Sequence, residues 1–112
     1  MYTLIMTQVI VTFCTCPDKA TAEKIALLLV EANLAACVNI LPNLTSVYSW
    51  QGKIETTEEH LLIIKSPQIA YKAIETAIRS QHPYELPEII AVPVGQGLPE
   101  YINWIHSCHA SK

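Results

Sequence analysis

Two cysteines and a histidine have the clearest capacity for chemistry in this sequence. Cys14 and Cys16 are two residues apart, and His82 lies in the polar stretch SQHPYELPE, residues 80–88. Residues two apart on a regular strand point to the same face, which predicts both sulfur atoms on one side. Two thiolates and an imidazole suit Cu(I), which favours soft ligands. The alternative is structural, because free cysteines are often buried and a histidine at a helix end suits the helix dipole.

The residues that follow His82 predict one wall of a binding cleft. Pro83 restricts the backbone, and Tyr84 and Glu88 add polar groups to the same short segment. We interpret this segment both as a stiff link from a helix to a strand and as the wall of a cleft between subunits.

Two other polar groupings carry weaker signals. The densest acidic run holds Glu55, Glu58, Glu59 and His60. Such a run could hold a hard divalent cation, but it is more often a solvated strand face. The tail HSCH, residues 106–109, has metal-binding residue types, and at a chain terminus we expect only adventitious binding.

The sequence has no P-loop, G-x-S-x-G or H-E-x-x-H motif, so we expect no enzyme unless a thiolate and His82 meet across an interface.

Composition argues against several classes of protein. The chain has 112 residues, 51% of them hydrophobic and 15% charged, which predicts a packed core. A net charge of −3 with scattered Lys and Arg residues argues against nucleic acid as a partner, and the apolar runs are too short to span a membrane. The four cysteines form no C-x-x-C pair and no secretory signal is evident, so we expect a reduced, cytoplasmic protein. The high apolar fraction also indicates a second buried surface, such as a subunit interface.

The elements that position these residues begin with a buried strand over residues 8–14. A helix follows, with Asp18 as N-cap and Asn33 closing it in the left-handed conformation. Two long extended segments, residues 36–50 and 53–66, then flank a Gln-Gly pair that suits a two-residue hairpin turn. The apolar alternation of the first segment slips at Pro-Asn, residues 42–43, which predicts a bulge.

The second half of the chain predicts a helix, a strand and a terminal helix. Ser66 and Pro67 resemble an N-cap followed by proline at the first helical position, and Pro83 ends this helix at about Gln81. Residues 88–94 form a proline-flanked strand, which belongs at a sheet edge because proline cannot donate to a ladder. A short helix starts at Pro99.

This order of elements predicts one α+β domain over residues 1–112 with the ferredoxin-like βαββαβ arrangement and a C-terminal helix. Right-handed crossovers favour the strand order 4-1-3-2. The hairpin of the second and third strands is too long for such a domain. A strand of about 14 residues spans roughly 45 Å, whereas the radius of gyration of a domain of this size is near ~13 Å. The hairpin must therefore bend or pair with another chain, which predicts an oligomer built by strand addition.

Five motifs together resemble the CutA divalent-cation tolerance family. They are VTFCTCPD, LAACVNILP, SVYSWQGKIE, HPYELPEIIAVPV and YINWI, in this order from about Val9 to Ile105. The resemblance implies a ferredoxin-like fold similar to the PII signalling proteins. It also implies a compact homotrimer with hairpins packed across subunits, and a role in tolerance of copper and other divalent metals. We expect such a trimer to resist heat, because assembly adds interface energy to each fold.

The resemblance assigns candidate ligands residue by residue. Cys14 matches the copper-associated cysteine of bacterial members, and His82 matches the second of two histidines. Gln81 stands where the first histidine would be, so copper is expected on Cys14 and His82 with Cys16 as the substitute ligand. Glu59 and Lys65 match positions that members tend to share, which makes Glu59 the preferred carboxylate of the acidic run.

We therefore expect a trimeric cytoplasmic protein of copper tolerance, without enzymatic activity, that binds a metal ion or small ligand at clefts between subunits. The expected metal ligands are Cys14, Cys16 and His82, and the expected ligand-binding residues are Glu59, Lys65, Tyr84 and Glu88. The alternative is a structural or adaptor trimer that docks other proteins and has no metal chemistry of its own.

Overall fold

A computed structural model describes residues 8–109 of the chain. Its elements, in order, are β1 (Val9–Cys16), α2 (Lys19–Glu31), β2 (Cys37–Trp50), β3 (Lys53–Pro67), a 3₁₀ turn (Gln68–Ala70), α3 (Tyr71–Gln81), β4 (Ile89–Pro93) and α4 (Pro99–Ser107). The expectation that no secretory signal precedes the fold, and the outer limits of the predicted domain, fall on residues outside this range.

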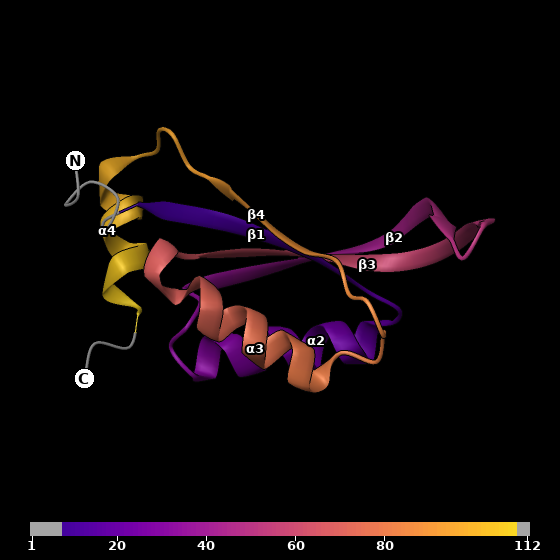
Figure 1. Cartoon of the computed structure of the whole chain (residues 1–112). Coiled ribbons are helices and arrows are strands. Elements are labelled where there is room, and N and C mark those ends of the chain that lie inside the picture. The colour runs from indigo at the N-terminus through magenta and orange to yellow at the C-terminus, as the bar shows by residue number, and fades with distance from the viewer. Residues whose placement is uncertain (1–7, 110–112) are drawn as a thin grey trace.

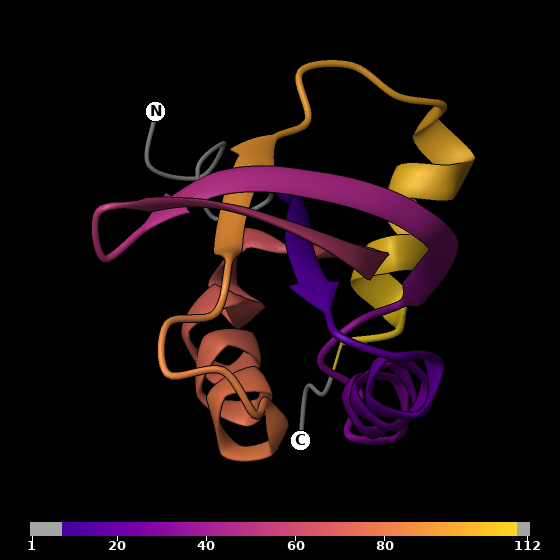
Figure 2. The same ribbon diagram turned by 90° about the vertical axis from the view of Figure 1, so that its right-hand side faces the viewer.

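The four strands form one sheet in the order β2-β3-β1-β4, which confirms the predicted arrangement. Each neighbouring pair is antiparallel. Helices α2 and α3 lie side by side on one face of the sheet, and α4 lies at the end away from the hairpin tip (Figures 1 and 2). The fold is therefore the expected α+β sandwich, with the proline-containing β4 at an edge. Across residues 8–109, no helix combines the length and the apolar character that a membrane crossing requires.

The core lies between this sheet and the two helices. Cys14 pairs with Leu62 across β1 and β3, so the two side chains share the face that the helices cover. The helices bury their apolar stripes against this face, and the fully buried side chains include Ile25, Leu29, Ile74 and Ile78. Burying each such side chain contributes about 1.5–3 kcal/mol. The cysteine end of β1 is thus fixed by the same packing that stabilises the domain.

Both predicted caps of α2 are present. Asp18 Oδ1 accepts a hydrogen bond from the Thr21 N–H at 2.8 Å, as an N-cap should. At the other end Asn33 has φ 59°, and the Leu34 N–H donates to the Leu29 carbonyl at 3.0 Å. This reversal satisfies helix-end carbonyls and returns the chain to the sheet.

The predicted start of the second helix was wrong. Ser66 and Pro67 are the buried last residues of β3, and Ser66 Oγ donates to the Pro67 carbonyl instead of capping a helix. A 3₁₀ turn follows, and α3 begins only at Tyr71. Pro67 has extended geometry, φ −64° and ψ 151°, which a proline at a strand end adopts as readily as one at a helix start.

The hairpin has the predicted turn and the predicted bulge. Gln51 and Gly52 both have positive φ, 51° and 81°, which is the backbone of a two-residue hairpin turn. The pairing of β2 with β3 shifts between Leu41 and Leu44, where Asn43 has φ 64°. Since one extra residue reverses the alternation of side chains, the bulge brings the outer half of β2 into a new register.

The outer part of the hairpin extends beyond the two helices (Figure 1). The domain measures 44 × 27 × 22 Å, so its long axis is set by the hairpin direction rather than by the packed core. This agrees with the length expected of a strand of 14 residues.

The bulge generates a test of the hairpin geometry. Replacing Asn43 with Val places a β-branched residue at positive φ and should cost roughly 1–2 kcal/mol of unfolding free energy. Replacing it with Gly should leave stability close to the parent, because glycine adopts this conformation without strain. Urea denaturation measures both, with Thr45→Val in the same strand as a control. Equal stability of the Val and Gly variants would contradict the assigned bulge.

Candidate functional site

The structure brings the predicted thiols and imidazole together in one buried cluster. Cys14 Sγ, Cys16 Sγ and a ring nitrogen of His82 all lie within 4.8 Å of one another. Strand β1 extends two residues further than predicted, so both cysteines belong to it and point to the helix-covered face. Helix α3 ends at Gln81, and Pro83 holds His82 in an extended conformation, which directs the chain to the end of β1.

Both ring nitrogens of His82 already have hydrogen-bond partners. Nε2 lies 2.7 Å from the Thr15 carbonyl oxygen, and Nδ1 accepts the Tyr84 N–H at 3.2 Å. Because Nδ1 is an acceptor, Nε2 carries the proton and donates to Thr15. A metal ion bound at Nε2 would require the neutral ring to carry its proton on Nδ1 instead, so both the bond to the Thr15 carbonyl and the bond from the Tyr84 N–H would be lost.

The two thiols differ in their acidity. The Cys14 thiol donates to Cys16, and this hydrogen bond, burial and nearby negative charges raise the pKa of Cys14 far above its ordinary value. The same hydrogen bond lowers the pKa of Cys16, against an opposing effect of burial. Cys14 Sγ also lies 3.8 Å from the Thr15 carbonyl oxygen, which is a weaker contact. Cys16 is therefore the sulfur that forms a thiolate more readily, with Cys14 as its donor.

A phenol–carboxylate pair lies beside the cluster. The Tyr84 hydroxyl donates to Glu59 Oε2 at 2.7 Å, and Glu59 is only 5% exposed. The Tyr84 ring lies 4.7 Å from the His82 ring, centroid to centroid. Burial, followed by the hydrogen bond to Glu59 and the charge of Glu59, raises the pKa of Tyr84 above its ordinary value of 10.0. Tyr84 thus connects the buried cluster to the surface beyond it.

That surface is a groove of about 880 Å³ between the outer half of β2 and the segment that follows α3. Thr15 and Glu59 line it from β1 and β3, and Glu88 lines it from the opposite segment. The bulge places Leu44 opposite Glu59, so Tyr48 and Trp50 share the face of Glu59 by alternation. The groove therefore combines aromatic side chains with carboxylates.

The structure separates the other predicted site residues from this centre. Lys65 does not line the groove, and its Nζ lies 5.9 Å from the centroid of the Tyr101 ring. It shares the face of Glu59, but the two are six positions apart along the strand, a distance of about 20 Å. The acidic run is divided in the same way, because Glu58 is exposed on the other face. The tail residues 106–109 lie in and after α4, at the far end of the sheet (Figure 1).

The Thr15 carbonyl is the functional group that sequence reasoning missed. Every residue has a carbonyl, so no residue type marks the one that will accept a hydrogen bond from a residue 67 positions away. His60 was grouped with the acidic run, whereas it pairs directly with Cys16 at the end of β1. The length of β1 would have been needed to predict this pairing.

The chain resembles known proteins over most of its length. Residues 10–108 match a family model described as CutA1 divalent ion tolerance protein. Protein CutA of Mus musculus is 49% identical over 84% of this chain and 53% of its own length. The divalent-cation tolerance protein CutA of Thermus thermophilus is 44% identical over 81% of this chain and 88% of its own length. The chain thus spans about half the length of the mammalian relatives it matches.

Solved structures of similar proteins share the fold. CutA from Xylella fastidiosa has a TM-score of 0.88 and 50% identity, covering 91% of this chain and 98% of that one. CutA1 from Oryza sativa has a TM-score of 0.91 and 35% identity, covering 96% of this chain and 99% of that one.

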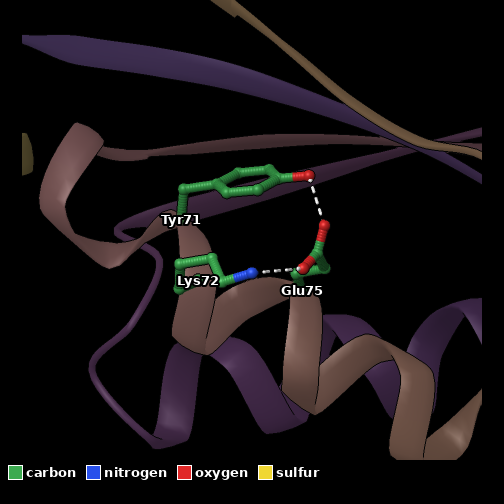
Figure 3. Close-up of polar contacts among 3 residues, drawn as sticks. All are labelled: Tyr71, Lys72 and Glu75. Carbon is green, nitrogen blue, oxygen red and sulfur yellow. Dashed lines mark hydrogen bonds and ion pairs between the residues drawn. The ribbon is translucent and has the colours of Figure 1, made fainter.

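The buried phenol–carboxylate pair generates a prediction about stability. Tyr84→Phe should destabilise the fold by roughly 1–3 kcal/mol, because it leaves a buried acceptor on Glu59 without its donor. Tyr71→Phe is the matched control, since Tyr71 donates to Glu75 at 2.9 Å on the surface of α3, where Lys72 also contacts Glu75 (Figure 3). Tyr71→Phe should lower the free energy of unfolding by much less. Equal losses in urea denaturation would contradict a special role for the Glu59 contact.

The same pair predicts how stability depends on pH. The raised pKa of Tyr84 means that the unfolded chain loses this proton first, from about pH 10 upward. The contribution of Tyr84 is therefore fully present below this pH and is lost as pH rises through the folded-state pKa. The stability difference between the parent and Tyr84→Phe should shrink above about pH 10. A difference that stays constant from about pH 8 to pH 11 would contradict the assignment.

Proposed function

This chain belongs to the CutA1 divalent ion tolerance family, and on that premise we propose that it is a trimeric, non-enzymatic protein of cation tolerance that binds a soft metal ion, Cu(I) above all, on Cys14, Cys16 and His82. The observation that carries the proposal is the convergence of two sulfur atoms and one imidazole nitrogen within 4.8 Å. Relatives named for divalent-cation tolerance support a metal as the ligand class. The four cysteines are free thiols, which is in keeping with the cytoplasmic location that remains part of this proposal.

The donor set fits Cu(I) in chemistry as well as in position. Thiolates are the soft ligands that Cu(I) prefers, and Cys16 forms a thiolate more readily than an ordinary cysteine. His82 would add a third donor at Nε2 with its ring proton moved to Nδ1, which gives up the bond to the Thr15 carbonyl and the bond from the Tyr84 N–H. Gln81 offers no comparable ligand, so Cys16 takes the place of a second histidine. The metal would neutralise the thiolate charge in a buried setting where an unpaired charge is costly.

The proposed trimer rests on apolar side chains that the single chain leaves exposed. Val47 and Ile54 near the hairpin tip, and Ile90 and Val92 on β4, are between 45% and 75% exposed. In the described chain β2 and β4 are the two outer strands of the sheet, each with one side free for pairing. An exposed apolar edge strand is an aggregation site unless another chain covers it. The groove beside Tyr48 and Glu88 would then become a cleft between subunits, open to a small ligand.

An adaptor trimer without metal chemistry is the second candidate. The hydrogen bonds at both nitrogens of His82 favour it, because the ring is satisfied without a metal ion. In this case the cluster would only stabilise the joint between α3 and β1, and the exposed groove would dock a protein partner.

A titration separates the two candidates. Under reducing conditions, with a competing chelator, Cys14→Ser and His82→Ala should each weaken Cu(I) binding by at least ~10-fold, since even the loss of an outer-shell partner costs 10–100-fold. Cys37→Ser is the control, because Cys37 is a half-buried thiol outside the cluster. If either ligand variant binds as tightly as the parent, the metal proposal fails. If truncation after Ile105 alone abolishes binding, the tail holds the metal.

Light scattering tests the assembly. The parent should have three times the mass of the 12.5 kDa chain at micromolar concentration. Ile90→Lys should shift the mass toward one chain, because it places a charge on the free edge of β4. Leu27→Lys is the control, since Leu27 is equally exposed, at 58%, but lies on α2. A parent of one-chain mass, or dissociation of the Leu27 variant alone, would overturn the proposed interface.

A further inference from the structure

The geometry points to His60 as an additional metal ligand that converts the three-donor cluster into a four-donor Cys₂His₂ site for Zn²⁺. This inference rests on the proposed metal site at Cys14, Cys16 and His82. It adds a ligand from β3 and a second metal with a different preferred geometry.

The position of His60 is set by the sheet. His60 pairs directly with Cys16 in the last rung of the β1–β3 ladder, so the two side chains lie on the same face. Directly opposed residues have Cβ atoms about 4.5–5.5 Å apart. The sulfur atoms of Cys14 and Cys16 lie on this face, within 4.8 Å of His82. Helix α2 begins and helix α3 ends near this end of β1 (Figure 1).

The ring of His60 has an unused nitrogen. Its Nδ1 is buried and has no hydrogen-bond partner among the described residues. A buried polar atom without a partner is unfavourable, and each such atom in a native protein calls for an explanation. His82 differs, because both of its ring nitrogens are engaged. Of the two imidazoles, His60 is the one that gains a partner without giving one up.

The three donors within 4.8 Å do not include His60, so its ring must turn to join them. The movement that the inference requires is a change of the His60 side-chain rotamer, because the ladder places the backbone of position 60 directly opposite Cys16. Asp18 lies close enough to His60 for the charge of His60 to help lower the pKa of the Asp18 carboxyl. The larger cause of this lowering is the hydrogen bonding from Thr21. Asp18 is therefore the candidate carboxylate to support the second ring nitrogen of His60, as carboxylates commonly do for histidines that bind metals.

The fourth donor changes the metal preference. Two sulfur and two nitrogen ligands form one of the tetrahedral sets that hold Zn²⁺ in proteins. Without His60 the site has three donors, two of them soft, and suits Cu(I). His60 should therefore matter for Zn²⁺ and little for Cu(I), which separates a ligand from a residue that merely maintains the fold.

The experiment compares metals on the full chain under reducing conditions. Zn²⁺ affinity is measured by competition, and Co²⁺ is used as a spectroscopic probe whose visible bands report tetrahedral thiolate coordination. His60→Val introduces a β-branched residue, which suits a strand, and should weaken Zn²⁺ binding by at least ~10-fold while Cu(I) binding stays unchanged. His109→Ala is the matched control, because His109 Nδ1 is also buried with no partner within residues 8–109 but lies after α4.

Each outcome decides a different claim. Equal Zn²⁺ affinity in the parent and His60→Val overturns the role of His60. A parent that binds Cu(I) but neither Zn²⁺ nor Co²⁺ overturns this inference and leaves the proposed function standing. A parent that binds none of the three metals overturns both. Should His60→Val fail to fold, histidine ring ¹⁵N spectra of the parent with Zn²⁺ decide, since the His60 nitrogens must shift if they bind the metal.

Discussion

One hydrogen bond connects the two halves of this domain at the place where its chemistry gathers. His82 Nε2 donates to the Thr15 carbonyl across 67 residues of sequence, so the end of α3 is fixed to the end of β1. This contact sets the position of the imidazole beside the two sulfur atoms. It also sets the path of the chain that follows, which carries Tyr84 to Glu59 and then returns along β1, where Ile89 pairs with Cys14. The cluster, the phenol–carboxylate pair and the groove wall all depend on this contact.

The electrostatics of the site follow from how closely these groups are placed. Glu59 is buried and needs its donor, and its charge acts on both thiols as well as on Tyr84. In the structure, both ring nitrogens of His82 have hydrogen-bond partners, and the two thiols share a hydrogen bond. A soft metal ion would replace these internal hydrogen bonds with coordination bonds. The binding free energy of the site is therefore the difference in free energy between the coordinated and the hydrogen-bonded arrangement. This competition explains why a binding role and a purely structural role are both compatible with the same contacts.

Local signals were sufficient to predict most of the fold. The side chain of Asp18 caps the start of α2, and the backbone of Asn33 adopts the left-handed conformation that ends it. The prolines within residues 83–93 exclude a central position in the sheet for the strand that they flank. The start of α3 could not be predicted because Pro67 suits a strand end as well as a helix start. At the site, strand spacing predicted that Cys14 and Cys16 share a face, and the resemblance to the family assigned His82 as their partner. The Thr15 carbonyl was not predicted, because a backbone acceptor leaves no mark in the sequence. Lys65 was grouped with Glu59 although the two are six positions apart on one strand. The rise per residue alone could have excluded a shared site.

A crystal structure of the protein loaded with Cu(I) under reducing conditions is the most direct test of the account. The account predicts one copper ion bonded to Cys14 Sγ, Cys16 Sγ and His82 Nε2, with the bond from Nε2 to the Thr15 carbonyl broken. A copper ion bound only at the tail or elsewhere on the surface, with the His82–Thr15 hydrogen bond intact, would contradict it and would leave the cluster a structural joint.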